Sequence, residues 1–559
     1  MIKKMSIIQY RKLKNLTLDF SSKINVIAGG NGTCKSSLLH LISNSFQNVI
    51  GKHSKSTDPK CLGIIKAINS SVNPKIESLT RGDKKYNEPA KGIKGHLFTV
   101  TYADGVELSF RRHNSGKSNR YALKPWYASG HNDKLPAIPV IYLGLTRLYP
   151  FGEFQNDEKI TKIKHGLPDP YQQELIKQYK ELTRIDIFSM QPQNVGDIKF
   201  RTDFESKADG VDSNTISSGE DNIFIILTAL FSLKYYYDYL PEDERINRTA
   251  SILLIDEFDA TLHPALQIRL LDLVRDFSSN YRIQIVATTH SLSLLEYALR
   301  QKDNVIYLKD NIEAIDVMDH PDIFKIKMDL KTQTRKDIYL DKEIPIFTED
   351  AEARAFLEAI FNYWQKRDIH FKLIRSCFYL SESLFGCETL RQMFKDRKLA
   401  SILRAICVLD GDNNKDIGNY IISLPGHASP ENVIFEYAEK LYADNSDFWS
   451  LEEVDYAGYS RKLYADTFQK EYKSIDIRIQ ELKDNDESTH GKKRTMMKEL
   501  WDNHHEFIDL VIKQWVNDPS NADAIRTFIQ DLNCMFKKTA LYHGINNKDW
   551  DISDEVNNE

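Results

Sequence analysis

The sequence of 559 residues lacks the features that would place a protein in a membrane or outside the cell. No stretch approaches the roughly 20 uncharged apolar residues that a membrane-spanning helix needs. The first residues are basic, but no sustained apolar run with a small-residue cleavage site follows them, so we expect no secretory signal. These absences predict a cytoplasmic protein that makes no contact with a membrane.

Cysteine is scarce, and the six cysteines are scattered along the chain without a Cys-x-x-Cys pair. This spacing argues against a zinc site and against a disulfide framework, and it fits a reducing compartment.

An excess of positive charge is also missing, because the net charge is −5. The whole molecule therefore offers no electrostatic footprint for nucleic acid, and any such contact must come from a local basic patch or from a partner. The length and a hydrophobic content of 41% suffice for two or three domains with sizeable cores.

A glycine-rich turn follows a short apolar run at residues 24–28 and precedes apolar residues at helical spacing in 36–45. Strand, glycine loop and helix in this order are typical of a phosphate-binding loop, whose backbone N–H groups and helix N-terminus face the phosphates. We expect Lys35 to reach the β- and γ-phosphates of ATP and Ser36 to ligate Mg²⁺. The predicted nucleotide contacts in this turn are Gly29, Gly30, Asn31, Gly32, Thr33, Cys34, Lys35, Ser36 and Ser37.

One position departs from the pattern G-x-x-x-x-G-K-[ST], because Cys34 stands where a glycine precedes the lysine. Cysteine has a Cβ atom that glycine lacks, so we expect slight strain in the loop. The expected consequence concerns the rate of turnover more than nucleotide binding.

Two carboxylates follow a second apolar run, at residues 252–255. A buried strand of this kind delivers such side chains to the edge of an α/β sheet where ligands bind. We expect Asp256 to hold Mg²⁺, directly or through water. Glu257 is the candidate general base that polarises the attacking water.

Three further elements accompany these carboxylates. A Ser-Ser-Gly-Glu segment that opens a strongly apolar helix precedes them, a Phe-Asp turn follows them directly, and a histidine stands at the end of another apolar strand. With them, the chain resembles the ABC/SMC-type ATPases over roughly residues 1–308, including their RecF-like and OLD-like branches. The resemblance implies that Asp259 communicates across a dimer and that His290 contacts the γ-phosphate. It also implies that a signature facing the γ-phosphate of the other protomer is formed by Ser217, Ser218 and Gly219.

The same resemblance implies a homodimer or a higher homo-oligomer, since each nucleotide would be held between the lysine loop of one subunit and the signature of another. The segment 142–153 occupies the region of the family's glutamine loop but has no glutamine, so Arg147 and Glu153 are its candidates.

We predict an α/β fold class: an ABC-type ATPase head without a long coiled coil, a smaller Toprim-like α/β domain and a helical C-terminal region. Long-armed relatives are excluded because fewer than about 200 residues, without sustained heptads, separate Lys35 from Ser217. The expected ranges are 1–325, 343–428 and 429–559, with a charged boundary at 325–342. Within the head we expect an insertion at about 51–135, containing a hairpin over 98–110, and a mostly helical lid at about 154–212.

In the second domain, acidic residues end two short apolar strands. Glu349 followed by Asp410 and Asp412 resembles the Toprim constellation, in which carboxylates converge on Mg²⁺ for phosphodiester chemistry. Two departures leave a structural remnant as the alternative: Asp350 replaces the usual glycine, and the nearest lysine is Lys415.

The later segment 424–431 (LPGHASPE) looks like the loop after the Toprim-like domain in anti-phage ATPases of the Septu type. This resemblance implies an ATPase subunit that acts with a separate HNH nuclease. It further implies a retron reverse transcriptase and its nucleic acid as partners. The alternatives are an OLD-family nuclease that cuts with its own Toprim site, and a RecF-like DNA-repair ATPase.

Overall fold

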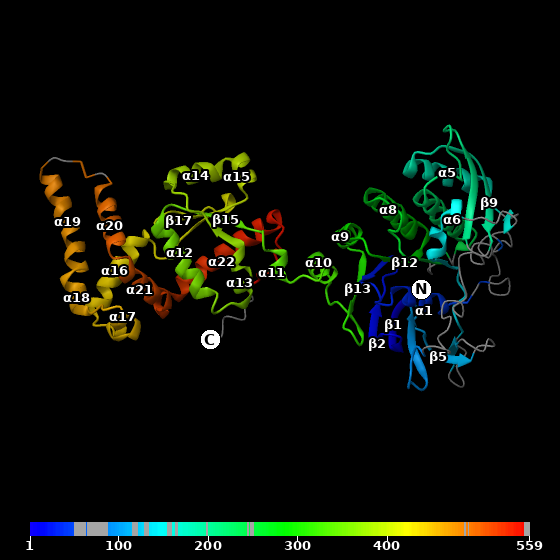
Figure 1. Cartoon of the computed structure of the whole chain (residues 1–559), viewed down its shortest axis with the longest axis horizontal. Helices are drawn as coiled ribbons and strands as arrows, with labels where there is room; N and C mark the ends of the chain where they lie inside the picture. The colour runs from blue at the N-terminus through cyan, green and yellow to red at the C-terminus, as the bar shows by residue number, and fades with distance from the viewer. Residues whose placement is uncertain are drawn as a thin grey trace. The chain divides into compact units, whose positions relative to one another are not determined.

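The computed structural model of the chain describes residues 1–47, 49, 63, 88–114, 121–127, 134–153, 159–162, 166–196, 199–242, 245, 251–485, 488–489 and 491–552. Much of the predicted insertion at 51–135, and 154–158, 163–165 and 197–198 of the predicted lid, lie outside these residues. The chain forms two compact units, Met1–Thr332 and Gln333–Glu559 (Figure 1). No helix in the described ranges is long and apolar enough to cross a membrane.

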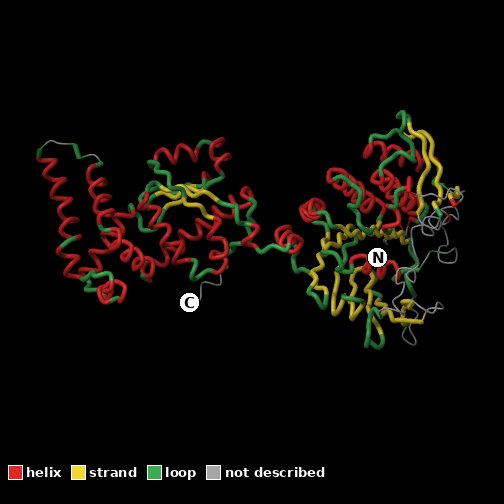
Figure 2. The backbone as a smooth tube through the Cα atoms, in the orientation of Figure 1, coloured by secondary structure: helices red, strands yellow, loops and turns green. Residues whose placement is uncertain are grey.

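Unit 1 is built on an 11-stranded sheet with the order β6-β5-β4-β1-β2-β14-β13-β3-β12-β11-β7. Strands are drawn yellow in Figure 2. Five of these strands, from β13 to β7, run parallel, so their C-terminal ends meet at one edge. The strands are β1 (Ile2–Tyr10), β2 (Leu13–Asp19), β3 (Ile24–Gly29), β4 (His96–Tyr102), β5 (Glu107–Asn114), β6 (Tyr121–Trp126), β7 (Val140–Leu143), β11 (Ser251–Ile255), β12 (Ile283–Thr289), β13 (Asn304–Asp310) and β14 (Ile315–Val317).

Helices cover both faces of the parallel strands. Helix α1 (Lys35–Asn44) packs on one face, and α5 (Asp169–Thr183), α6 (Ser218–Asp238), α8 (Pro264–Tyr281) and α9 (Leu292–Arg300) pack on the other. Side chains alternate along a strand, so Leu253 and Ile255 join the core under α6 while Ile252 and Leu254 join the core under α1. Burial on both faces explains why the run 252–255 is apolar throughout.

The predicted hairpin over 98–110 is present as the antiparallel pair β4 and β5. Strand β4 also pairs with β1, so this part of the predicted insertion extends the main sheet instead of standing apart from it.

The expectation of a mostly helical lid at 154–212 is wrong. Helix α5 is present, but it is accompanied by a three-stranded sheet of β8 (Ile160–Lys162), β9 (Ile187–Val195) and β10 (Lys199–Ser206). Phe204 of β10 stacks on Phe224 of α6, with ring centroids 5.7 Å apart, and lies beside Tyr179 of α5. Packing on these helices stabilises polar strands whose own propensity is weak.

Unit 2 contains a four-stranded parallel sheet with the order β16-β15-β17-β18. Its strands are β15 (Ile344–Thr348), β16 (Phe378–Leu380), β17 (Ile406–Leu409) and β18 (Ile421–Ser423). Helices α14 (Cys387–Lys395) and α15 (Arg397–Leu403) lie on one face (Figure 1). The other face carries α12 (Ala351–Trp364), α13 (Ile369–Ile374) and α22 (Ala522–Thr539).

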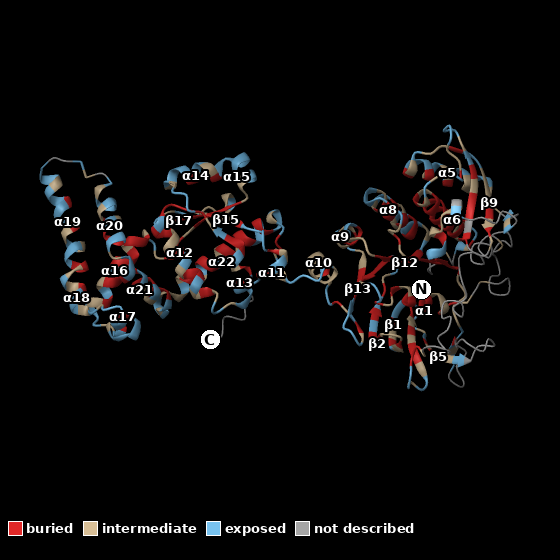
Figure 3. Cartoon of the chain, viewed as in Figure 1, coloured by how far each residue is buried: buried red, intermediate tan, exposed pale blue. Residues whose placement is uncertain are grey.

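The region after residue 429 is helical, as predicted. It contains α16 (Pro430–Ala443), α17 (Glu452–Tyr456), α18 (Arg461–Asp466), α19 (Phe468–Asp484), α20 (Lys492–Asn503) and α21 (His505–Asn517). It packs on the sheet domain within the same unit: Trp515 of α21 meets Phe356 of α12, with centroids 5.0 Å apart, and Phe536 of α22 meets Phe378 of β16. Helices α12 and α22 both contain buried residues, drawn red in Figure 3, and these include Phe356 and Phe536.

Candidate functional site

The phosphate loop joins β3 to α1 in a close turn. Gly29 has φ +150°, and a Cβ added there would lie 2.3 Å from the carbonyl oxygen of Leu308, so no larger residue fits. Within the loop, the Lys35 ammonium donates hydrogen bonds to the carbonyl oxygens of Gly29 (3.1 Å) and Gly30 (3.0 Å). The loop thus has the tight backbone and the buried cation that suit a phosphate-binding turn.

Cys34, the residue that replaces the usual glycine, has left-handed backbone angles of φ 65° and ψ 24° immediately before α1. This conformation is unfavourable for a residue with a Cβ atom, so the strain expected from the sequence is present in the backbone.

Replacement of Cys34 by glycine is expected to stabilise unit 1 by about 0.5–1 kcal/mol, since relief of left-handed strain exceeds the added entropy of the unfolded chain. Chemical denaturation of Cys34→Gly against the parent chain measures the difference. The matched control is Lys331→Gly at the exposed end of α10 (Ile323–Lys331), where helical backbone angles predict a loss of similar size. If both variants lose stability, Cys34 is not strained.

Asp256 lies at the end of β11 and is 2% exposed. Its Oδ1 accepts a hydrogen bond from Thr288 Oγ1 (2.7 Å), and its Oδ2 accepts one from the Tyr142 hydroxyl (3.4 Å). The Tyr142 hydroxyl donates its hydrogen to Asp256 and can only accept from His40. The N–H at His40 Nε2 therefore donates to the Tyr142 hydroxyl oxygen, 2.9 Å away. Burial lowers the pKa of His40 to about 4, so this ring is neutral and supports the chain of donors.

Glu257 and His290 face each other beside this carboxylate. Their Oε1 and Nε2 atoms are 3.4 Å apart, and the backbone N–H of Glu257 donates to Thr288 Oγ1 (2.8 Å). Burial raises the pKa of Glu257, and the charge of Asp256 adds to the rise although His290 opposes it. A glutamate with a raised pKa beside an imidazole is the kind of group that can accept a proton from water.

Lys35 belongs to the same site. Burial lowers the pKa of its ammonium, while the charges of Glu257, Asp256 and Asp259 act in the opposite direction. The sheet edge therefore brings together one buried cation from the start of α1 and three carboxylates from the turn after β11.

The serine-rich segment forms the start of α6. Ser217 caps this helix in a reciprocal pair with Glu220, whose carboxylate accepts from the Ser217 backbone N–H (2.8 Å). A Cβ added to Gly219 would lie 2.4 Å from the carbonyl oxygen of Thr261, so the helix start packs tightly on the turn after β11. In that turn, Asp259 accepts from Thr289 Oγ1 and from the backbone N–H of His290.

Ser217 and Ser218 do not reach the phosphate loop of their own chain. Among the described residues, no hydrogen bond or ion pair joins either serine to the turn at 29–37. The two halves that the family resemblance assigns to one nucleotide are thus both present in the chain but are not joined within it.

Arg147 is the candidate from 142–153 that the structure brings to the site, whereas Glu153 is exposed. The buried Arg147 guanidinium donates to Asn222 Oδ1 of α6 (2.8 Å) and to the carbonyl oxygen of Glu257 (2.8 Å). Burial lowers its pKa to about 10. Arg147 therefore ties the start of the signature helix to the turn that carries the general-base candidate.

Sequence reasoning missed Thr288, Tyr142 and His40, which orient Asp256 and Glu257. Thr288 stands two residues before His290, at the end of the apolar strand. That position at the end of a strand could have marked it as a residue of the site. Nothing in the local pattern marks Tyr142 or His40.

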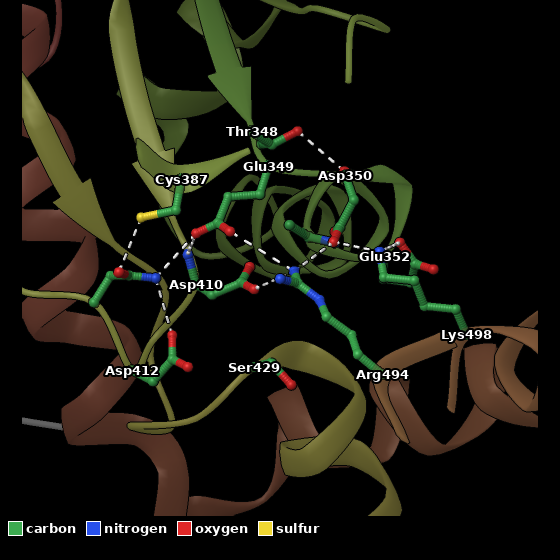
Figure 4. Close-up of polar contacts among 12 residues, drawn as sticks. Thr348, Glu349, Asp350, Glu352, Cys387, Asp410, Asp412, Ser429, Arg494 and Lys498 are labelled. Carbon is green, nitrogen blue, oxygen red and sulfur yellow. Dashed lines mark hydrogen bonds and ion pairs between the residues drawn. The ribbon is translucent and has the colours of Figure 1, made fainter. Parts of the chain in front are cut away.

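A second acidic cluster lies in unit 2, where β15 and β17 end side by side (Figure 4). The backbone N–H of Asp410 donates to Glu349 Oε1 (3.0 Å), and Asn413 Nδ2 donates both to Glu349 Oε1 and to Asp412 Oδ1 (3.0 Å each). The three residues predicted for a Toprim-like site are therefore neighbours. Lys415 is not part of the cluster, because its ammonium pairs with Asp531.

Two cations from α20 enter this cluster. Arg494 lies between Glu349, Asp350 and Asp410, at 3.7, 3.1 and 3.3 Å, and Lys498 contacts Asp350 (Figure 4). No set of three or more His, Cys, Asp or Glu side chains in the described part of the chain is arranged to hold a metal ion. As they lie here, these carboxylates surround a guanidinium and do not fit Mg²⁺.

Residues 75–296 match the family described as "AAA domain, putative AbiEii toxin, Type IV TA system". These residues of unit 1 are therefore similar to an AAA domain. The match includes Asp256, Glu257, the serine-rich segment at 217–219 and His290. No protein in a search of curated sequences matches the chain.

Among solved structures, an SMC head bound to the C-winged helix domain of ScpA is 15% identical, with TM-score 0.33 over 57% of this chain and 96% of that one. An SMC head domain from Thermotoga maritima is 13% identical, with TM-score 0.31 over 57% and 99%. The recombination mediator protein RecF is 12% identical, with TM-score 0.31 over 57% and 98%. TM-scores this low assign no function to the chain.

Proposed function

We propose that the protein is the ATP-binding and ATP-hydrolysing subunit of a bacterial anti-phage complex, in which nucleotide-driven dimerisation controls a separate HNH nuclease. The observation that supports dimerisation most directly is the separation of the signature serines from the phosphate loop of the same chain. A second copy would supply Ser217, Ser218 and Gly219 to the γ-phosphate.

In this proposal, different residues of one chain bind the phosphates, hold Mg²⁺ and accept the proton during ATP hydrolysis. Backbone N–H groups of the loop and the Lys35 ammonium bind the phosphates. Ser36 and Asp256 would hold Mg²⁺, which offsets phosphate charge when it is bound; the fixed, buried carboxylate of Asp256 suits that role. Glu257 accepts the proton of the attacking water, and His290 orients Glu257 from 3.4 Å.

The cations in the second cluster favour a separate nuclease over an OLD-family enzyme that cuts with its own Toprim site. Arg494 lies where such a site needs a metal ion, and phosphodiester chemistry of that kind depends on the ion. The toxin named in the matching family description is in keeping with a defence role. A retron reverse transcriptase with its nucleic acid is the further partner that the Septu resemblance suggests, and a RecF-like repair ATPase is the remaining alternative.

Complementation between two inactive variants tests the shared site. Lys35→Ala disables the loop, and Ser218→Glu places a carboxylate that suits the helix start but repels a phosphate. Each variant alone should be inactive, while an equal mixture should regain about a quarter of wild-type ATPase activity, because half the dimers carry one intact site. A mixture of Lys35→Ala with Glu257→Gln is the control and should regain nothing. Equal failure of both mixtures contradicts a site shared between chains.

Nuclease assays test the rest of the proposal. The purified chain, incubated with DNA or RNA and Mn²⁺, should leave both intact, and an HNH protein encoded beside it should copurify with it when the two are coexpressed. Cleavage by the chain alone that disappears in Asp410→Ala would establish the OLD-like alternative instead. ATP-dependent DNA binding without a nuclease partner would favour the RecF-like alternative.

A further inference from the structure

Helix α20 contributes two basic side chains to an acidic cluster that belongs to a different part of unit 2. The side chains of Glu349 and Asp410 are 4% and 3% exposed, whereas that of Arg494 is 53% exposed. The arginine therefore reaches the buried carboxylates from the solvent side. Withdrawing its guanidinium would leave the sheet and its core in place.

Negative charge in the cluster exceeds the positive charge that α20 supplies. Lys498 bridges Asp350 (2.5 Å) and Glu352 (3.1 Å), and Arg494 contacts Glu349, Asp350 and Asp410. Glu431, at the start of α16, is close enough for its charge to act on Asp410 and Arg494. Asp410 Oδ1 and both carboxylate oxygens of Glu431 are buried and form no hydrogen bond within the described residues. A buried carboxylate oxygen without a partner destabilises the charged form of the group. Binding of a further cation or a proton to the cluster is therefore favourable.

The pKa values of the cluster express the same imbalance. Burial, followed by the charges of Glu349 and Asp350, raises the pKa of Asp410 to about 8. Burial also raises the pKa of Glu349 and Glu352. The pKa of Asp350 is lowered in spite of burial, because Lys498 donates a hydrogen bond to it.

The first turn of α20 is poorly supported by its own sequence. The residue before the helix, Gly491, provides no side-chain cap, and the turn contains Lys492, Lys493 and Arg494 with no acidic residue. Positive side chains at a helix N-terminus oppose the helix dipole. The buried anchors of the helix lie further along, at Met497, Leu500 and Trp501. The ion pairs of Arg494, together with the pair between Lys493 and Asp476 of α19, therefore help to hold the first turn in place.

We propose that Arg494 and Lys498 are an internal counter-cation that takes the place of a divalent metal ion in this cluster. A divalent cation and α20 then compete for the same carboxylates, and occupancy by the metal releases the first turn of the helix. In this state of unit 2 the guanidinium keeps the cluster closed to metal.

Mn²⁺ binding to the full-length chain without nucleotide tests the competition, with free Mn²⁺ followed by electron paramagnetic resonance. The double variant Arg494→Ala, Lys498→Ala should bind one additional Mn²⁺ at least tenfold more tightly than the wild type does at this cluster. Adding Asp410→Asn should abolish the gain. The matched control, Lys483→Ala with Lys493→Ala, removes one charge from α19 and one from α20 outside the cluster. It should bind Mn²⁺ as the wild type does. No gain, or a gain that survives Asp410→Asn, overturns the proposal.

Hydrogen exchange of the wild-type chain provides a test that does not depend on the folding of the variant. Millimolar Mn²⁺ should increase amide exchange in residues 492–498 several-fold and leave 500–516 unchanged, and the Asp410→Asn chain should show no such response. Unchanged exchange at 492–498 under Mn²⁺ overturns the proposal as well.

Discussion

Replacement of Lys35 by alanine is expected to weaken ATP binding by about 100-fold or more. The ammonium is buried within the loop, and in the bound state it would exchange its hydrogen bonds to Gly29 and Gly30 for bonds to phosphate oxygens. Each charge-assisted bond contributes about 1.5–3 kcal/mol, and every 1.4 kcal/mol is a factor of about ten in affinity. Titration calorimetry with ATP and Mg²⁺ measures the loss directly.

The matched control for this variant is Lys309→Ala. Lys309 is an exposed lysine near the end of β13, a strand that pairs with β3, and its removal should leave ATP affinity unchanged. Retention of wild-type affinity by Lys35→Ala would mean that ATP does not bind at the turn 29–37. That result would remove the basis of the proposed function.

Replacement of Glu257 by glutamine is expected to lower kcat for ATP hydrolysis by about 100- to 1,000-fold while ATP binding is retained. General-base catalysis by a positioned carboxylate contributes about 10²- to 10⁴-fold, and the amide cannot accept a proton from water. The substitution preserves shape beside His290, and the backbone N–H bond to Thr288 does not involve the side chain. Steady-state phosphate release gives kcat.

Because hydrolysis opens the proposed dimer, the Glu257→Gln chain should also accumulate as a dimer with ATP, as measured by light scattering after size exclusion. Glu296→Gln, on the surface of α9 where the glutamate pairs with Arg300, is the control and should match the wild type in rate and in mass. Unchanged turnover in Glu257→Gln would remove Glu257 from its proposed role. If turnover in Glu257→Gln is slow but the chain is a monomer in every nucleotide state, the result contradicts the proposed dimer and leaves the role of Glu257 in place.

Several parts of the fold were predictable from the sequence because local pattern and burial agree there. The runs 24–28, 252–255 and 283–287 form strands of the parallel sheet, as their short, largely aliphatic character predicts. The polar strands β9 and β10 were not predictable, because their own alternation is weak. Aromatic contacts of Phe204 with α5 and α6 stabilise β10, and β9 pairs with β10. We also predicted separate ranges for a Toprim-like domain, 343–428, and a helical region, 429–559. In the structure, helices of the second range pack on the domain formed by the first.

The sequence by itself determined which residues meet at the candidate nucleotide site, because a glycine loop before a helix and carboxylates after a buried strand reach the same sheet edge wherever the strands are parallel. Only the tertiary structure decided how those groups are held and what neutralises the second cluster. Tyr142 meets Asp256 across 114 positions, and Arg494 meets Asp410 across 84. Contacts between such distant positions leave no periodic trace in the chain, since they depend on how whole elements pack and not on the spacing of neighbours.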